Sequence, residues 1–461
     1  MKESPNKKTF LLAIMGMALV ISLIAISRSF IYKNIVDGYD YSLGEAKSIP
    51  ISISHEQFTW PAGIQSYDTV FLKADFHSNF LGELFQPFVK VECKGDQFIQ
   101  SFEKGTPGNQ YVNISPCASK LKPGDKVHFS SPFLFLSGTD SYTLVLFQNK
   151  SLDGQSILVV APHPDDAEMA AFGLYAFRNS TIVTVTLGEE GKQKYKHIFN
   201  DRAESYLVKG QMRFWDSITV PFYGDVPPSR SVNLGYFDGT LEQMYSNPQQ
   251  KVASTETGIS DLQIFRKHNL SDLAPLDVHD ATWINLVHDF VTILGRVHPT
   301  IIVMPHPILD SHPDHRYSTI AVLEALKQSG SGKEIIYFYS NHFVNREDWP
   351  MGPTESLVNL PPWHDNQFLF DRIYSHAMSD RAYKMKFFAL DGMHSLRPSF
   401  FWNFDGVFGW MGLTEKALEF GHRRAKTFRK SWHPNELFFV VDSDHLQKLN
   451  LESLDFRGRI K

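Results

Sequence analysis

From about residue 155 onwards, the chain alternates between short apolar runs and helical patterns. The predicted strands cover 156–161, 181–188, 300–305 and 334–340, and the predicted helices cover 167–177, 200–214, 283–297 and 318–328. Buried strands that alternate with helices are typical of a parallel sheet covered on both faces. We therefore expect an α/β fold with a doubly wound, mostly parallel, Rossmann-like sheet. The polar stretch 225–280 has no clear periodicity and is predicted to be a long insertion or loop.

Residues 49–150 follow a different pattern. Short aromatic and β-branched runs are separated by turn residues, which predicts a small antiparallel β-sandwich-like domain. The chain's two cysteines, Cys93 and Cys117, both lie in this region. In a domain outside the cytoplasm they could form a disulfide, and the alternative is two buried free thiols. The sequence does not decide whether this region binds sugar or packs on an enzyme.

Residues 9–27 carry no charged side chain. A run of this length can span a bilayer as a helix. A cleavable signal peptide is the closest alternative, with Ala25 and Ser27 before a cut at Arg28, and a buried core helix is another. Lysines before the run favour a cytoplasmic N-terminus. We therefore expect a single-pass membrane protein whose catalytic part faces outside the cytoplasm, in a periplasm or lumen, or else a secreted protein.

The 461 residues exceed the length of a typical single domain. We expect four segments, namely an anchor or uncleaved signal at 1–30, a linker at 31–48, the β-rich region at 49–150 and a catalytic domain at 151–461. With 45 Lys and Arg against 50 Asp and Glu, no basic excess points to a nucleic-acid partner. Two cysteines exclude a zinc site made of four thiolates, whereas 19 histidines make a His/Asp site plausible.

Two polar clusters follow predicted strands. Ala161–Glu168 reads Ala-Pro-His-Pro-Asp-Asp-Ala-Glu, and His306–His315 ends in His-Pro-Asp-His. In open α/β sheets, ligands bind at the carboxyl ends of the strands, so the two clusters can meet there. Taken alone, the first could be only a helix N-cap and the second only a loop. Their positions after two buried strands of one domain favour a functional site.

A catalytic zinc ion takes three protein ligands and leaves one position open for water. His163, Asp166 and His315 would supply two imidazoles and a carboxylate. A carboxylate beside the metal can accept the proton of the attacking water. The residues left for such proton transfer are Asp165, His312 and Asp314.

These motifs resemble those of the PIG-L/LmbE-like zinc deacetylases. The likeness covers roughly residues 155–345 and continues loosely to residue 390. The similar segments are Pro162–Glu168 with Gly173, Thr186–Gly191, Arg202–Glu204, His312–Arg316 and Lys386–Leu390. Family members often have Gly-Gly after the first motif, whereas this chain retains one glycine, Gly173. The β-rich region lies outside the resemblance.

The resemblance implies a role for each matching residue. His163, Asp166 and His315 correspond to the metal ligands, and Asp165 corresponds to the general base. His312 would stabilise the oxyanion and protonate the leaving amine.

Two further roles are implied. Asp314 would orient His312, and Arg202 would contact substrate. The alternative for Arg202 is an exposed salt bridge with a nearby carboxylate.

The predicted function is therefore zinc-dependent removal of an N-acetyl group from an amino sugar in a glycan or glycolipid. The identity of the sugar comes only from the resemblance. One alternative is hydrolysis of another amide or acyl group. The other is a non-catalytic glycan-binding or assembly protein.

Overall fold

The computed structural model describes residues 15–19, 22, 39, 41–64, 67–137, 142–195, 198–330, 332–344, 348–362, 370–396 and 426–446. Most of the apolar run 9–27 and most of the predicted linker lie outside these residues, so the anchor, the signal peptide and the linker remain sequence-based predictions. Within the described part of the chain, no helix combines the length and the apolar character needed to cross a bilayer.

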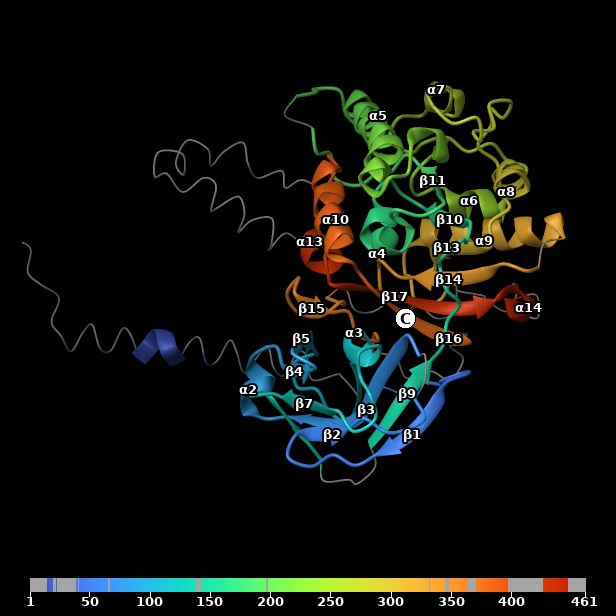
Figure 1. Cartoon of the computed structure of the whole chain (residues 1–461). Coiled ribbons are helices and arrows are strands. Elements are labelled where there is room, and N and C mark those ends of the chain that lie inside the picture. Colours follow the sequence, from blue (N-terminus) through green and yellow to red (C-terminus); the bar gives the residue numbers. More distant parts are fainter. Residues whose placement is uncertain are drawn as a thin grey trace, which may run out of the picture.

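The larger sheet has seven strands in the order β12-β11-β10-β13-β14-β17-β16 (Figure 1). The strands are β10 (Ile157–Ala161), β11 (Ser180–Thr186), β12 (Ser231–Tyr236), β13 (Ile301–Pro305), β14 (Ile335–Tyr339), β16 (Arg372–Ala377) and β17 (Asn435–Asp442). The pairs from β12 through β14 are parallel, and β17 is antiparallel to both of its neighbours. The predicted mixed α/β fold is confirmed.

Helices pack on both faces of this sheet. The longer ones are α4 (Asp166–Tyr175), α5 (Arg202–Thr219), α8 (Trp283–Val297), α9 (Pro313–Ser329) and α10 (Asp380–Gly392). The shorter ones in this part are η1 (Val220–Gly224), η2 (Pro228–Arg230), α6 (Leu241–Ser246), α7 (Gln263–Arg266), α13 (Lys426–Ser431) and α14 (Ser443–Leu446). Successive residues of β10 point to opposite faces of the sheet. Val159 packs in the core that contains Phe172 of α4, and Val160 packs in the core that contains Phe290 of α8.

Three strands of the large sheet, β12, β16 and β17, were not predicted, and β12 is the one that bears on the site. The stretch 225–280, expected to be an insertion or loop, contains the edge strand β12, so that expectation was wrong for Ser231–Tyr236. This strand carries Asn233 and Gly235 among its apolar residues, and Gly235 adopts a φ of +75° next to a register shift. These residues break the apolar run that marks a buried strand. The consequence for the site is that β12 brings Asp238 to its carboxyl end.

The N-terminal part folds as two small, mainly antiparallel sheets. One has the order β1-β9-β3-β6 with β8 beside β3, and the other has the order β15-β5-β4-β7-β2. Their strands are β1 (Lys47–Ile51), β2 (Gln57–Thr59), β3 (Thr69–Ser78), β4 (Phe88–Cys93), β5 (Asp96–Ser101), β6 (Asn109–Asn113), β7 (Lys126–Ser130), β8 (Leu134–Leu136), β9 (Tyr142–Phe147) and β15 (Ser356–Leu357). Helices α2 (Phe80–Leu84) and α3 (Ser115–Ala118) complete this part, and a disulfide joins Cys93 to Cys117.

The two parts are joined by strand pairing and buried polar contacts. Strand β15 comes from the chain after β14 and pairs in parallel with β5. The side-chain amide of Asn113 donates to Ser375 Oγ at 2.7 Å, and that of Asn435 donates to the same oxygen at 3.0 Å. Figure 1 shows the small sheets lying against the β16–β17 edge of the large sheet. The joint therefore fixes the β16–β17 edge of the sheet, against which α4 packs and from which the chain continues into α10.

Candidate active site

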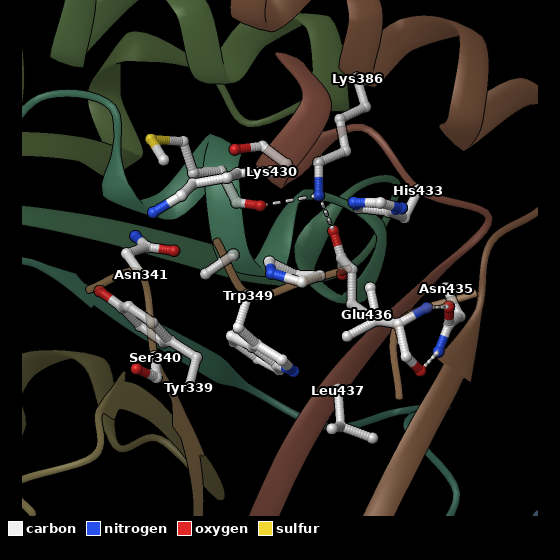
Figure 2. A pocket seen from close by; sticks show the side chains of 15 residues that line it. Tyr339, Ser340, Asn341, Trp349, Lys386, Lys430, His433, Asn435, Glu436 and Leu437 are labelled. Carbon is white, nitrogen blue, oxygen red and sulfur yellow. Dashed lines mark hydrogen bonds and ion pairs between the residues drawn. The ribbon is translucent and has the colours of Figure 1, made fainter. Parts of the chain in front are cut away.

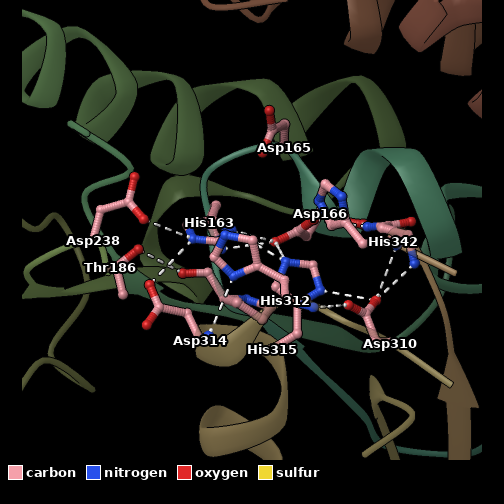
Figure 3. Close-up of polar contacts among 12 residues, drawn as sticks. His163, Asp165, Asp166, Thr186, Asp238, Asp310, His312, Asp314, His315 and His342 are labelled. Atoms are coloured by element: carbon pink, nitrogen blue, oxygen red, sulfur yellow. Dashed lines mark hydrogen bonds and ion pairs between the residues drawn. The ribbon is translucent and has the colours of Figure 1, made fainter. Parts of the chain in front are cut away.

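The two predicted clusters meet where the strand order reverses. Strands β10 and β13 are neighbours in the sheet, and the chain leaves them in opposite directions along the sheet, to β11 and to β14. Such a reversal opens a crevice at the carboxyl ends of the strands. His163 lies in the turn between β10 and α4, and His312 is the N-cap of α9 (Figure 3).

Three ligand atoms lie close to one another in this crevice. His163 Nδ1 lies 3.2 Å from Asp166 Oδ2 and 3.2 Å from His315 Nε2. Asp166 Oδ2 and His315 Nε2 are 3.1 Å apart. Ligand atoms on a tetrahedron about a zinc ion at roughly 2.0–2.1 Å would be about 3.3 Å apart. The donor set therefore fits a zinc ion in both chemistry and spacing.

The other ring nitrogen of each imidazole faces a carboxylate. His315 Nδ1 lies 3.0 Å from Asp310 Oδ2, and His163 Nε2 lies 3.1 Å from Asp238 Oδ1. A carboxylate favours the tautomer whose proton points at it, which leaves the opposite nitrogen with a free lone pair. Both lone pairs then face the oxygen of Asp166, as metal ligation requires.

Electrostatics in the cluster favour a cation. Burial lowers the pKa of the imidazoles of His315 and His163, whereas the surrounding carboxylates raise it. The carboxylates have the larger effect, so the pKa of His315 rises to about 10 and that of His163 lies well above 6.5. The imidazoles therefore hold protons when no metal competes for their lone pairs. Metal binding must release these protons, so metal affinity should fall as the pH falls.

Neighbouring groups could also contribute to metal binding. Within the described residues, groups of His, Asp or Glu with ligand atoms within 4.8 Å of one another include His163, His312 and His315, then Asp166, His315 and His342, then His163, Asp238 and Asp314. All three groups share a residue with the set described above. They form one continuous cluster around a single crevice.

Asp165 points away from the three donor atoms. Its Oδ1 lies 3.0 Å from Arg213 Nη2, and both side chains are nearly buried. Arg213 also donates to Ser395 Oγ. A guanidinium held in this way keeps the carboxylate in one orientation. Asp165 therefore does not join the three donor atoms, and its role as the general base stays a prediction.

His312 can donate a hydrogen bond into the crevice. Its Nδ1 accepts from the backbone N–H of Asp314 at 3.2 Å. Burial, together with the nearby imidazoles, lowers the pKa of His312 to about 3, so the ring is neutral. A neutral ring that accepts at Nδ1 carries its proton on Nε2. His312 can therefore stabilise a developing negative charge.

Asp314 and Arg202 have surroundings that the resemblance did not imply. The Asp314 carboxylate accepts from the Gly239 backbone N–H at 2.7 Å and lies 3.4 Å from His163 Nε2. Its side chain thus supports His163, and its backbone N–H supports His312. Arg202 is exposed and forms an ion pair with Glu256 at 2.8 Å. Arg202 does not join the central cluster, and its role in substrate binding stays a prediction.

Four residues near the ligands were not predicted. They are Arg213, Asp238, Asp310 and Asn341, which contact Asp165, His163, His315 and Asp166 in that order. Asp310 lies inside the second motif, and its place after β13 was a usable signal. The other three come from α5 and from the ends of β12 and β14, where no motif marks them.

A comparison with family models matches residues 158–326 to PIG-L, described as GlcNAc-PI de-N-acetylase. No curated protein matches. The similar solved structures include the deacetylase Dbv21 of the antimicrobial A40926 pseudoaglycone, at 15% identity and TM-score 0.33, covering 63% of this chain and 99% of that one. Another is N,N'-diacetylchitobiose deacetylase from Pyrococcus horikoshii, at 15% identity and TM-score 0.34, covering 66% and 89%.

A third similar structure is the hydratase GalB from Pseudomonas putida, at 13% identity and TM-score 0.33, covering 62% of this chain and 96% of that one. At these identities and TM-scores, the solved structures carry no argument about the reaction. The family match rests on the segment that contains both motifs and the strands that precede them.

Proposed function

We propose that this chain is a zinc-dependent hydrolase that removes an N-acetyl group from an amino sugar, and the match of residues 158–326 to the PIG-L family model supports the proposal. One observation carries the proposal. His163 Nδ1, Asp166 Oδ2 and His315 Nε2 lie within 3.2 Å of one another, and Asp165, the next residue before Asp166, is bound to Arg213 instead of joining them. Three ligands and a separate base are what metal-assisted hydrolysis of an amide requires.

A zinc ion held by these three residues would lower the pKa of a water molecule in its open position and polarise the amide carbonyl. Asp165, fixed by Arg213, accepts the proton of the attacking water. His312 donates from Nε2 to the carbonyl oxygen as negative charge develops there. The leaving amine takes up the proton that Asp165 accepted from the water, and we assign the transfer of that proton to the amine to His312.

The proposed substrate class is an N-acetylated amino-sugar unit of a glycan or glycolipid. The family supports the amino sugar, because its description names a GlcNAc-containing substrate. Free amine and acetate are the expected products.

We also propose that the catalytic part works outside the cytoplasm, with residues 9–27 as a membrane anchor. The disulfide between Cys93 and Cys117 supports this location, because disulfides persist in oxidising compartments. The uncharged run supports the anchor. Because both cysteines are buried, labelling with a thiol reagent after the cells are acid-quenched and the protein is denatured, with and without prior reduction, tests the location. Full labelling without prior reduction would contradict it.

The reaction is tested by measuring amine release from a panel of N-acetylated glycans and glycolipids, with the zinc-loaded protein and with the chelator-treated protein. We expect release from at least one amino-sugar substrate and loss of that activity with the chelator. Release that persists after the metal is removed would overturn the zinc mechanism. The absence of release from the whole panel would overturn the substrate class.

A further inference from the structure

Asn341 follows β14 and reaches across to the first turn of α4. Its Nδ2 donates to Asp166 Oδ1 at 2.8 Å and to the Asp166 backbone carbonyl at 3.2 Å. Its own backbone N–H donates to Asp310 Oδ2 at 2.9 Å. Asp310 is the carboxylate that faces His315 Nδ1. One half-buried residue therefore contacts one proposed ligand, Asp166, and the carboxylate that supports a second, His315.

We propose that Asn341 is a positioning residue that holds the Asp166 carboxylate so that only Oδ2 faces the other two donor atoms. The inference rests on the proposed function, in that Asp166 is taken as a metal ligand. A carboxylate at the start of a helix can rotate about its Cβ–Cγ bond. A hydrogen bond to Oδ1 together with the His163 backbone N–H, which donates to Oδ2 at 2.8 Å, removes that freedom.

The chemistry of an amide suits this task. The Asn341 amide donates a hydrogen bond to Asp166 without adding a positive charge that would compete with the metal for the carboxylate. A lysine or arginine in the same place would bring such a charge next to the donor set. Hydrogen bonds to the outer atoms of ligands orient them and contribute to metal affinity.

Asn341 also borders a pocket on its other side. The pocket lies between α4, α10 and the start of β17, and Figure 2 shows Asn341 among the side chains that line it. Met169 and Ala170, from the second turn of α4, line the same pocket. If Asn341 were truncated, water from this pocket would hydrate Asp166 Oδ1 in place of the amide, and the carboxylate would no longer be held in one orientation.

The test compares zinc affinity of full-length variants. Asn341→Leu keeps about the same volume and removes the donor, and Asn341→Ala removes both. Asn149→Ala is the matched control, because Asn149 also donates two side-chain hydrogen bonds, to Asp68 Oδ1 at 2.8 Å and to the Ile373 carbonyl at 3.0 Å, far from the crevice. Zinc affinity is measured by competition with a chromophoric chelator, and the visible spectrum of the cobalt-loaded protein reports ligand geometry.

We expect both Asn341 variants to bind zinc about 10–100-fold more weakly than the unmodified chain and to show a changed cobalt spectrum. The Asn149→Ala variant should bind zinc as the unmodified chain does. Unchanged affinity and spectrum in Asn341→Leu, or in Asn341→Ala if the leucine variant does not fold, would overturn this inference. Failure of the unmodified chain to bind zinc would instead overturn the proposed function.

Discussion

The joint between the small sheets and the large sheet buries neutral polar groups, whereas the crevice buries charged ones. At the joint, side-chain amides and hydroxyls such as Asn113, Ser375 and Asn435 satisfy one another. In the crevice, Asp166, Asp310 and Asp314 lie almost fully buried within the same cluster. Buried neutral groups are stable once they are hydrogen-bonded. Buried carboxylates that crowd together are costly unless a cation balances them.

This difference in buried charge separates the residues that stabilise the fold from the residues proposed to carry out the reaction. Changes at the joint or in the small sheets should alter the free energy of unfolding and leave zinc binding alone. Changes in the crevice should alter zinc binding or turnover and can leave stability unchanged. The predictions below are ordered from the largest expected effect to the smallest.

His315→Ala should abolish both zinc binding and activity. It removes one of three proposed ligands, so zinc affinity should fall by more than the roughly 10–100-fold that is lost when an outer partner is removed. Metal analysis of the purified variant measures the effect. His279→Ala, which removes an exposed imidazole paired with Asp261, is the control and should retain zinc. Normal zinc content in His315→Ala would show that the ligand set is wrong.

Asp165→Asn should keep zinc and lose activity. The amide preserves the shape of the side chain but cannot accept a proton from water, so turnover should fall about 10²–10⁴-fold. Zinc content and the rate of amine release are measured on the same sample. A variant that remains fully active would exclude Asp165 as the base.

Replacing both Cys93 and Cys117 by serine should lower stability without affecting zinc. The disulfide closes a loop with a sequence separation of 24, for which the chain-entropy model gives about 3 kcal/mol. Chemical denaturation measures the free energy of unfolding, and chelator competition measures zinc affinity. A large loss of zinc affinity in this variant would contradict the separation between the two regions.

Glu168→Gln should change how stability depends on pH. Burial, opposed by the hydrogen bond from Tyr175, raises the pKa of Glu168 from 4.5 to about 7. Between those values the folded protein binds a proton that the unfolded chain releases, so stability present below pH 4.5 is lost as the pH rises through 7. At pH 8.5 the glutamine variant should be more stable than the unmodified chain by about 1–3 kcal/mol.

At pH 4 the unmodified chain and Glu168→Gln should differ much less in stability, because the glutamate is then protonated in the folded state and mostly protonated in the unfolded state. Denaturation at the two pH values makes the comparison. An equal difference in stability at both would contradict the raised pKa.

The sequence predicted the α/β fold and the meeting of His163, Asp166 and His315 in one crevice because both leave local signals. Apolar runs marked β10, β11, β13 and β14, and the motifs stood directly after two of them. Strand β12 was missed because Asn233 and Gly235 interrupt its apolar pattern. Arg213 and Asn341 were missed because their roles depend on tertiary contacts with Asp165 and Asp166, which no spacing in the sequence encodes.

Anomalous diffraction at the zinc absorption edge, from crystals of the zinc-loaded protein, tests the central claim most directly. The account predicts one strong peak within bonding distance of His163 Nδ1, Asp166 Oδ2 and His315 Nε2, with Asp165 outside that shell. A peak on the other side of the His163 ring, between Asp238 and Asp314, would contradict the assigned ligands and the assigned tautomer. The absence of a peak in the crevice would contradict the metal centre itself.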